Sequence, residues 1–146
     1  MGRLLSLLSV ALLVAGCAKA PPTPTPAESY SYRAQEALAV SDYSGAWSLY
    51  KRAYSRAVVY GDLREQSMAL LNLAELATQM WKFSSADSLL RAIPPEWKNQ
   101  SEVVPLRETI AYKVAAGLGQ CDAPLAPSSE VKGEVGARLQ LAYALC

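Results

Sequence analysis

The sequence predicts an all-α fold of about six helices, arranged as stacked antiparallel hairpins. Long stretches are rich in Ala, Leu, Glu, Gln and Arg, which favour helices, and their apolar residues recur at steps of three and four. No segment alternates polar and apolar residues strictly enough to predict a β-strand. Breaks at Gly, Pro and Ser-Asp separate the stretches, and such short connections make consecutive helices antiparallel.

Residues 1–16 precede this fold and are predicted to be an export signal. A basic start at Arg3 leads into an apolar run over residues 4–15, which ends in small residues. The run is too short for a permanent membrane helix, which needs about 20 apolar residues.

Leu13, Ala15, Gly16 and Cys17, which close this run, resemble the lipobox of bacterial lipoproteins. The resemblance implies cleavage before Cys17 and acylation of this cysteine, which would anchor the protein in a membrane. Ala18 stands where Asp would imply retention, so the implied location is the outer membrane, facing the periplasm. An ordinary signal peptide with a chance cysteine is the alternative.

Residues 17–29 form a Pro/Thr-rich segment after the signal. Proline removes amide donors and favours the extended polyproline conformation, so no helix or strand is expected here. We interpret the segment as a semi-rigid tether, with a disordered spacer as the alternative. The helical domain is predicted to occupy residues 30–146.

Each predicted helix is bounded by a recognisable break. Asp42 and the segment from Asp62 to Glu65 have the pattern of N-terminal caps, Gly61 that of a C-terminal cap, and Pro94 stops a helix. The predicted helices span residues 30–40, 45–59, 63–80, 84–92, 102–118 and 129–145.

Two blocks of the sequence, residues 43–53 and residues 83–93, repeat each other. Tyr43, Ala46, Tyr50 and Ala53 return as Phe83, Ala86, Leu90 and Ile93, after small residues at Ala34, Ala37, Ala74 and Ala77. The pattern resembles the tetratricopeptide repeat, a helix–turn–helix unit of about 34 residues. The longer spacing, from position 43 to position 83, departs from that family, as do the absent Trp-Leu-Gly-Tyr signature and Val58 in place of the final proline. A plain six-helix bundle is the alternative.

Composition excludes several classes of site. Removing Arg3 with the signal leaves 13 basic and 13 acidic residues, and no basic run is present for nucleic acid or for anionic lipid. We therefore expect membrane attachment through the acylated Cys17 and no nucleic-acid partner. The chain has no His, which excludes a His-ligated metal or a Cys–His nucleophile. No catalytic or phosphate-binding motif occurs, so we expect neither an enzyme nor a cofactor.

Cys121 and Cys146 remain once Cys17 is counted as an anchor, and an even pair in an exported protein favours a disulfide. A simple hairpin would place them about 25 Å apart at about 1.5 Å per residue, too far for a bond. The Pro-rich residues 122–128, if extended, bring the last helix back toward Cys121. We therefore predict a Cys121–Cys146 disulfide.

The repeat resemblance implies a concave groove that is lined by the first helix of each pair and suits an amphipathic peptide. Its predicted lining is Ser31, Gln35, Leu38, Met68, Leu71, Glu75, Thr78 and Gln79. The alternative for Leu71 is that it packs on the next helical pair and does not line the groove.

An aromatic stripe from Tyr43 to Tyr54, together with Lys51, Arg52 and Arg56, suggests a stacking surface for protein or glycan. The helical spacing instead favours a position in the core for most of the aromatic residues, with the Lys and Arg side chains on the solvent face.

These expectations point to a non-enzymatic scaffold or assembly factor for an envelope complex. The alternative is a structural accessory subunit of one larger envelope complex. A glycan-binding protein or a regulator of a cell-wall enzyme is less well supported.

Overall fold

A computed structural model describes residues 23–120 and has five helices there and no strand. The helices are α2 (Pro26–Ala39), α3 (Tyr43–Tyr60), α4 (Leu63–Gln79), α5 (Phe83–Arg91) and α6 (Val104–Gly117). The prediction of an all-helical fold is confirmed for this part of the chain. The helix predicted over residues 129–145 lies outside the described residues, as do Cys17, Cys121 and Cys146.

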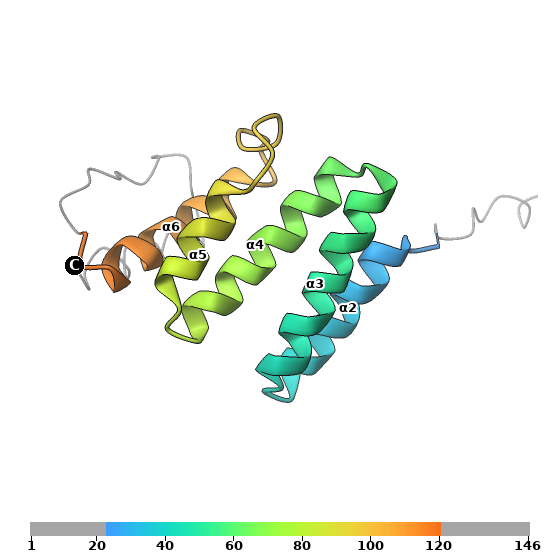
Figure 1. The fold of residues 1–146 in the computed structure, drawn as a ribbon, viewed down its shortest axis with the longest axis horizontal. Coiled ribbons are helices and arrows are strands. Elements are labelled where there is room, and N and C mark those ends of the chain that lie inside the picture. The colour runs from blue at the N-terminus through green and yellow to red at the C-terminus, as the bar shows by residue number, and fades with distance from the viewer. Residues whose placement is uncertain (1–22, 121–146) are drawn as a thin grey trace, which may run out of the picture.

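The helices follow one another as hairpins, with each helix packed on the next (Figure 1). α2 and α3 lie at one side, α5 and α6 at the other, and α4 lies between them. α4 also contacts both α2 and α6, so it joins the two halves of the domain.

α2 begins four residues earlier than predicted. Thr25 and Glu28 form a capping box, in which the Thr25 hydroxyl accepts from the Glu28 amide at 3.1 Å and the Glu28 carboxylate accepts from the Thr25 amide at 2.6 Å. Pro26 occupies the first helical position, where its missing donor and fixed φ are favourable. The prediction that no helix forms before residue 30 is therefore wrong for residues 26–29.

Three helix–helix turns share one backbone geometry and are evenly spaced along the chain. Each has one residue with φ near +60°, namely Ser41 (61°), Gly61 (67°) and Trp81 (58°). The next amide in each turn donates back to an alanine carbonyl five residues earlier, at Ala37, Ala57 and Ala77. This is the Schellman arrangement, which satisfies the last carbonyls of a helix. Both helices of the first sequence repeat thus end in the same type of turn, as does the first helix of the second repeat.

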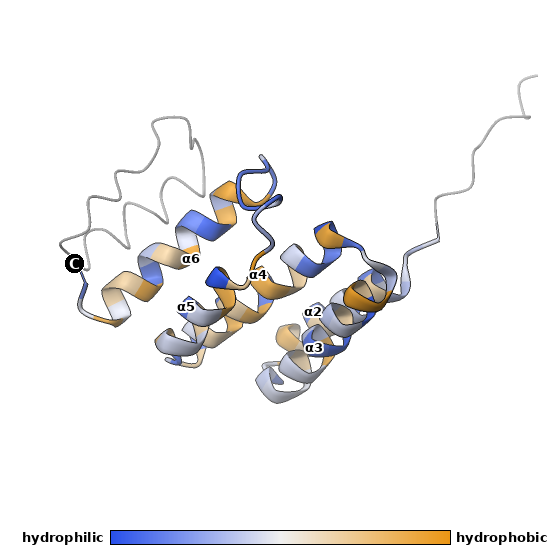
Figure 2. Ribbon diagram, turned by 45° about the horizontal axis from the view of Figure 1, so that its top comes forward, coloured by the Kyte–Doolittle hydropathy of each residue, from blue (hydrophilic) through white to orange (hydrophobic). Residues whose placement is uncertain are grey.

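Two hydrophobic cores meet at α4. One lies between α2, α3 and α4, and the other between α4, α5 and α6. The small residues at corresponding repeat positions are fully buried in these cores: Ala34, Ala46, Ala74 and Ala86. Figure 2 shows hydrophobic residues along α4 and α6, and a hydrophilic loop between α5 and α6. In the described part of the chain, no helix is long and apolar enough to cross a membrane.

Candidate partner-binding groove

A groove of about 590 Å³ lies between the first helices of the two hairpins, α2 and α4. Its lining is Pro24, Glu28, Ser29, Ser31, Tyr32, Gln35, Arg64, Glu65, Met68 and Asn72. No residue of α3, α5 or α6 contributes to it.

Helical periodicity explains why these residues share a surface. On α2 the lining recurs at residues 28, 31–32 and 35, and on α4 at residues 65, 68 and 72. Steps of three and four place these side chains on one face of each helix. Tyr32 is 64% exposed, and Met68 is half-buried against the α4–α6 core. The groove therefore offers a flexible thioether and an aromatic ring beside polar groups.

Arg64 organises the charged end of the groove. Its Nη1 donates to Glu65 Oε1 at 2.8 Å, while its Nε and Nη2 donate to the two oxygens of Glu102 at 3.1 Å each. Glu102 precedes α6, so this contact joins α4 to a segment 38 residues further along the chain. The hydrogen bond to Glu102 is the main cause that raises the pKa of Arg64. The guanidinium is thus occupied by this chain's own carboxylates.

Glu65 is the buried carboxylate of the groove, with 7% of its surface exposed. Its amide donates to the Asp62 carboxylate at 3.0 Å, which caps α4. Burial raises the pKa of Glu65, and the nearby Arg64 partly opposes this effect. Glu28, Asp62 and Glu102 raise the pKa further by repulsion between like charges. Acidic groups therefore outnumber the single basic group around the groove.

The structure brings together only some of the residues predicted to line a groove. Gln35 and Met68, with Ser31, line the groove between α2 and α4. Leu38 is half-buried and packs on the α2–α4 core. The prediction that Leu71 lines an open groove is wrong, because it is completely buried in the core that also contains Ile110 and Val114. The alternative, that Leu71 packs on the following helix pair, describes its position.

Glu75 and Gln79 lie away from the groove. Glu75 forms an ion pair with Lys113 of α6. Gln79 is exposed beside a second hollow of about 480 Å³, at the α4–α5 turn. That hollow is lined by Thr78, Gln79, Trp81, Phe83, Lys113, Ala116 and Gly117.

The predicted lining lacks five residues on which the groove depends: Glu28, Tyr32, Arg64, Glu65 and Asn72. Each lies within four residues of a predicted lining position, so extending the periodic pattern along both helices would have found them. The Arg64–Glu102 contact had no signal in the sequence, because it depends on how α6 returns to α4.

No residue in the described range belongs to a cluster of three or more acidic or sulfur ligands that could hold a metal. In comparisons with known proteins, no family model, no curated protein and no solved structure matches this chain. The lipidation of Cys17 and the Cys121–Cys146 disulfide fall outside the described residues and stay predictions.

Proposed function

We propose that this protein is a lipid-anchored lipoprotein of the outer membrane, facing the periplasm, that acts without catalysis as a scaffold or assembly factor for an envelope complex. In this proposal its tetratricopeptide-like domain binds a segment of another envelope protein in the groove between α2 and α4. The observation that carries the proposal is that the groove is built by the first helices of two successive hairpins, as the repeat resemblance implies.

The chemistry of the groove favours a basic, amphipathic segment as the partner. Tyr32 and Met68 offer apolar contacts, and Gln35 and Asn72 offer amide donors and acceptors. Glu28 and Glu65 attract a Lys or Arg side chain, because Arg64 is already held by Glu102 and Glu65. A cation at this point would also relieve the repulsion among the carboxylates.

Site-specific photo-crosslinking in intact cells tests this proposal. A photoreactive amino acid at Gln35 should yield a discrete adduct whose second component is identified by mass spectrometry. The same amino acid at Ser85, exposed on α5, serves as the control position. Adducts at Ser85 but none at Gln35 would contradict the groove as the binding site.

A matched pair of tyrosine substitutions sharpens this experiment. Tyr32 and Tyr60 are 64% and 65% exposed, but only Tyr32 lines the groove. Tyr32→Ala should abolish the adduct formed at Gln35, and Tyr60→Ala should retain it. Equal losses in both variants would count against a partner bound in the groove.

Anchoring is tested separately. Metabolic labelling with an alkyne fatty acid should modify the wild-type chain and not Cys17→Ser. Labelling that persists in Cys17→Ser would show that Cys17 is not the acylated residue.

One observation favours the alternative of an accessory subunit. Trp81 is 82% exposed at the α4–α5 turn, beside the second hollow, and a large exposed aromatic side chain is typical of an interface. A permanent subunit should aggregate or unfold when purified alone, whereas a scaffold should be a folded monomer. Light scattering and circular dichroism of the purified chain separate the two.

A further inference from the structure

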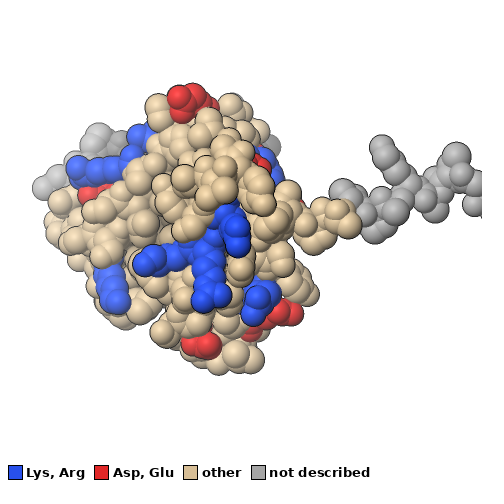
Figure 3. All heavy atoms as spheres, turned by 45° about the vertical axis from the view of Figure 1, so that its right-hand side comes forward, with Lys and Arg blue, Asp and Glu red and all other residues tan. Residues whose placement is uncertain are grey.

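The outer side of α3 carries positive charge, and no acidic residue of the same helix balances it. Lys51, Arg52 and Arg56 are exposed there, and Tyr43–Tyr60 contains neither Asp nor Glu. None of the three takes part in the ion pairs of the described residues, whereas Arg64 and Lys113 do. Figure 3 shows Lys and Arg side chains gathered on the face of the molecule where α2 and α3 lie.

The cations of α3 are spaced along the helix and do not form a continuous basic run in the sequence. One turn of helix separates Arg52 from Arg56, so these two side chains leave the same side of α3. Lys51 is also exposed and lies about 100° round the helix from Arg52. Arg33 adds an exposed cation on the neighbouring helix α2, outside the ion pairs of the described residues. The fold therefore presents a basic surface although the sequence has no basic run.

Exposed apolar side chains follow the cations at the end of α3. Val59 is 73% exposed and Tyr60 65% exposed, with Val58 and Leu63 beside them in the sequence. Exposed aliphatic and aromatic side chains next to cations are the composition of surfaces that lie at a membrane–water interface.

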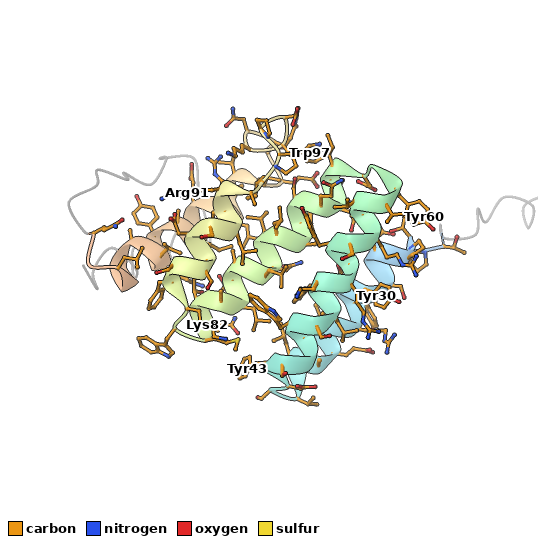
Figure 4. The ribbon with its side chains drawn as sticks, viewed as in Figure 1. Tyr30, Tyr43, Tyr60, Lys82, Arg91 and Trp97 are labelled. Atoms are coloured by element: carbon orange, nitrogen blue, oxygen red, sulfur yellow. The ribbon has the colours of Figure 1, made fainter. Side chains whose placement is uncertain are left out.

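The same end of α3 lies where the chain from Cys17 joins the domain. Tyr60 and Pro26, the first residue of α2, line one hollow of about 250 Å³. Figure 4 shows Tyr60 at the end of the domain where α2 begins. Only residues 18–25 separate Cys17 from Pro26, and a fully extended chain of about 3.5 Å per residue would bridge at most roughly 30 Å between them. An anchor at Cys17 would hold this end close to the bilayer.

We propose that the α3 surface, defined as Lys51, Arg52, Arg56, Val59 and Tyr60, rests on the anionic phospholipid headgroups of the membrane. The inference deepens the proposed anchoring and rests on it for the orientation of the domain. Each basic residue near an anionic surface favours binding roughly fivefold, so three together contribute on the order of a hundredfold. No residue of α3 lines the groove, so the membrane-bound domain would keep that groove open to a partner.

Vesicle co-sedimentation of the chain from Ala18 to Cys146 tests the surface without the lipid anchor. This form contains every helix of the described structure, and circular dichroism verifies its folding. It should sediment with vesicles in which phosphatidylglycerol is mixed into phosphatidylcholine as a minor component, and not with pure phosphatidylcholine. Binding should disappear at about 0.5 M salt, because charges at such a surface are screened within a few ångströms.

Charge reversal locates the binding surface. The triple variant Lys51→Glu, Arg52→Glu, Arg56→Glu should bind the anionic vesicles at least a hundredfold more weakly. The control Lys82→Glu, Arg91→Glu, Lys98→Glu changes the net charge equally on and beside α5 and should lose far less. Val59→Asp should weaken binding severalfold with no loss of helicity, because that side chain is exposed.

Two results would overturn the inference. One is equal binding to neutral and anionic vesicles, or binding to neither. If the protein bound neither kind of vesicle, an acidic protein would be the better candidate for the ligand of these cations. The other is an equal loss in the two triple variants. Since Cys17 is absent from this form, a failure here is distinct from a failure of lipidation, which fatty-acid labelling measures.

Discussion

Three residues with positive φ terminate the helices of the repeat, but only Gly61 is a glycine. Ser41 and Trp81 adopt the left-handed conformation with a Cβ atom present, at a cost of about 1 kcal/mol each. The Schellman hydrogen bonds and the packing of the following helix hold them there. Residue identity at these turns is therefore not optimised for stability.

Ser41→Gly should stabilise the domain by about 0.5–1 kcal/mol, because it removes the left-handed strain at an exposed position. Urea unfolding followed by circular dichroism measures the change. Ser55→Gly, in the middle of α3, is the matched control and should destabilise by about the same amount. Destabilisation by Ser41→Gly would contradict this explanation of the turn.

Gly117 permits a close approach between α6 and the start of α5. A Cβ atom at residue 117 would lie 2.4 Å from the ring of Phe83. Although alanine favours helices by about 1 kcal/mol, Gly117→Ala should destabilise the domain by about 1–3 kcal/mol through overpacking. The same change in a Phe83→Ala background should become neutral or stabilising. A double-mutant cycle measured by urea unfolding checks this reversal of sign.

Glu65 couples the stability of the domain to pH. Its folded-state pKa is raised above the ordinary value of 4.5, so the folded chain binds this proton more tightly than the unfolded chain. Its contribution to stability is therefore greatest below about pH 4.5 and declines as the pH rises through the raised pKa. In Glu65→Gln this decline should be absent, so the unfolding free energy should fall less between pH 4 and pH 7. Glu96→Gln, at an exposed position, should behave as wild type.

The helices themselves could be predicted from the sequence to within two residues for α3–α6. Periodic apolar residues and the breaks at Asp42, Gly61 and Pro94 carry this information locally. The start of α2 was missed because the prolines before Glu28 were interpreted as ending regular structure, although Pro26 is favourable at a first helical position. Local sequence patterns thus predict where the helices lie. The one large error, at the start of α2, comes from how the prolines were interpreted.

Thr25→Ala tests the capping box that starts α2. Loss of the side-chain bond to the Glu28 amide should cost about 1 kcal/mol and fray the first helical turn. Hydrogen exchange of the first α2 amides should accelerate, while α5 and α6 stay protected. Thr23→Ala, two residues earlier and outside the helix, should change neither quantity.

At the scale of the whole molecule, α4 is the element that both cores share. Its residues Leu73 and Leu76 belong to the core with α2, and Leu70 and Leu71 to the core with α6. The repeat resemblance predicts Leu71 in a groove because it implies an open side for the first helix of each pair. The return of α6 onto α4 closes that side, and only long-range packing determines it. The groove lies instead on the α2 side of α4, where Gln35 and Met68 line it.

Leu71→Ala should therefore cost about 2–5 kcal/mol, because it leaves a cavity in the core. Gln35→Ala, in the open groove, should change stability by less than about 0.5 kcal/mol. Thermal or urea unfolding distinguishes a core residue from a binding residue by this contrast. Similar small effects at both positions would mean that Leu71 is not buried in solution.

The turns at residues 41, 61 and 81 are evenly spaced and have the same backbone conformation. This regularity affects how such a chain can change its length. Removing residues 42–81 would join Ser41 to Lys82, and the new junction would keep the left-handed residue followed by the start of a helix. A duplication of the same segment would likewise add one complete hairpin with its buried alanines in register. Gene duplication or deletion in this unit would thus lengthen or shorten the domain without designing a new turn.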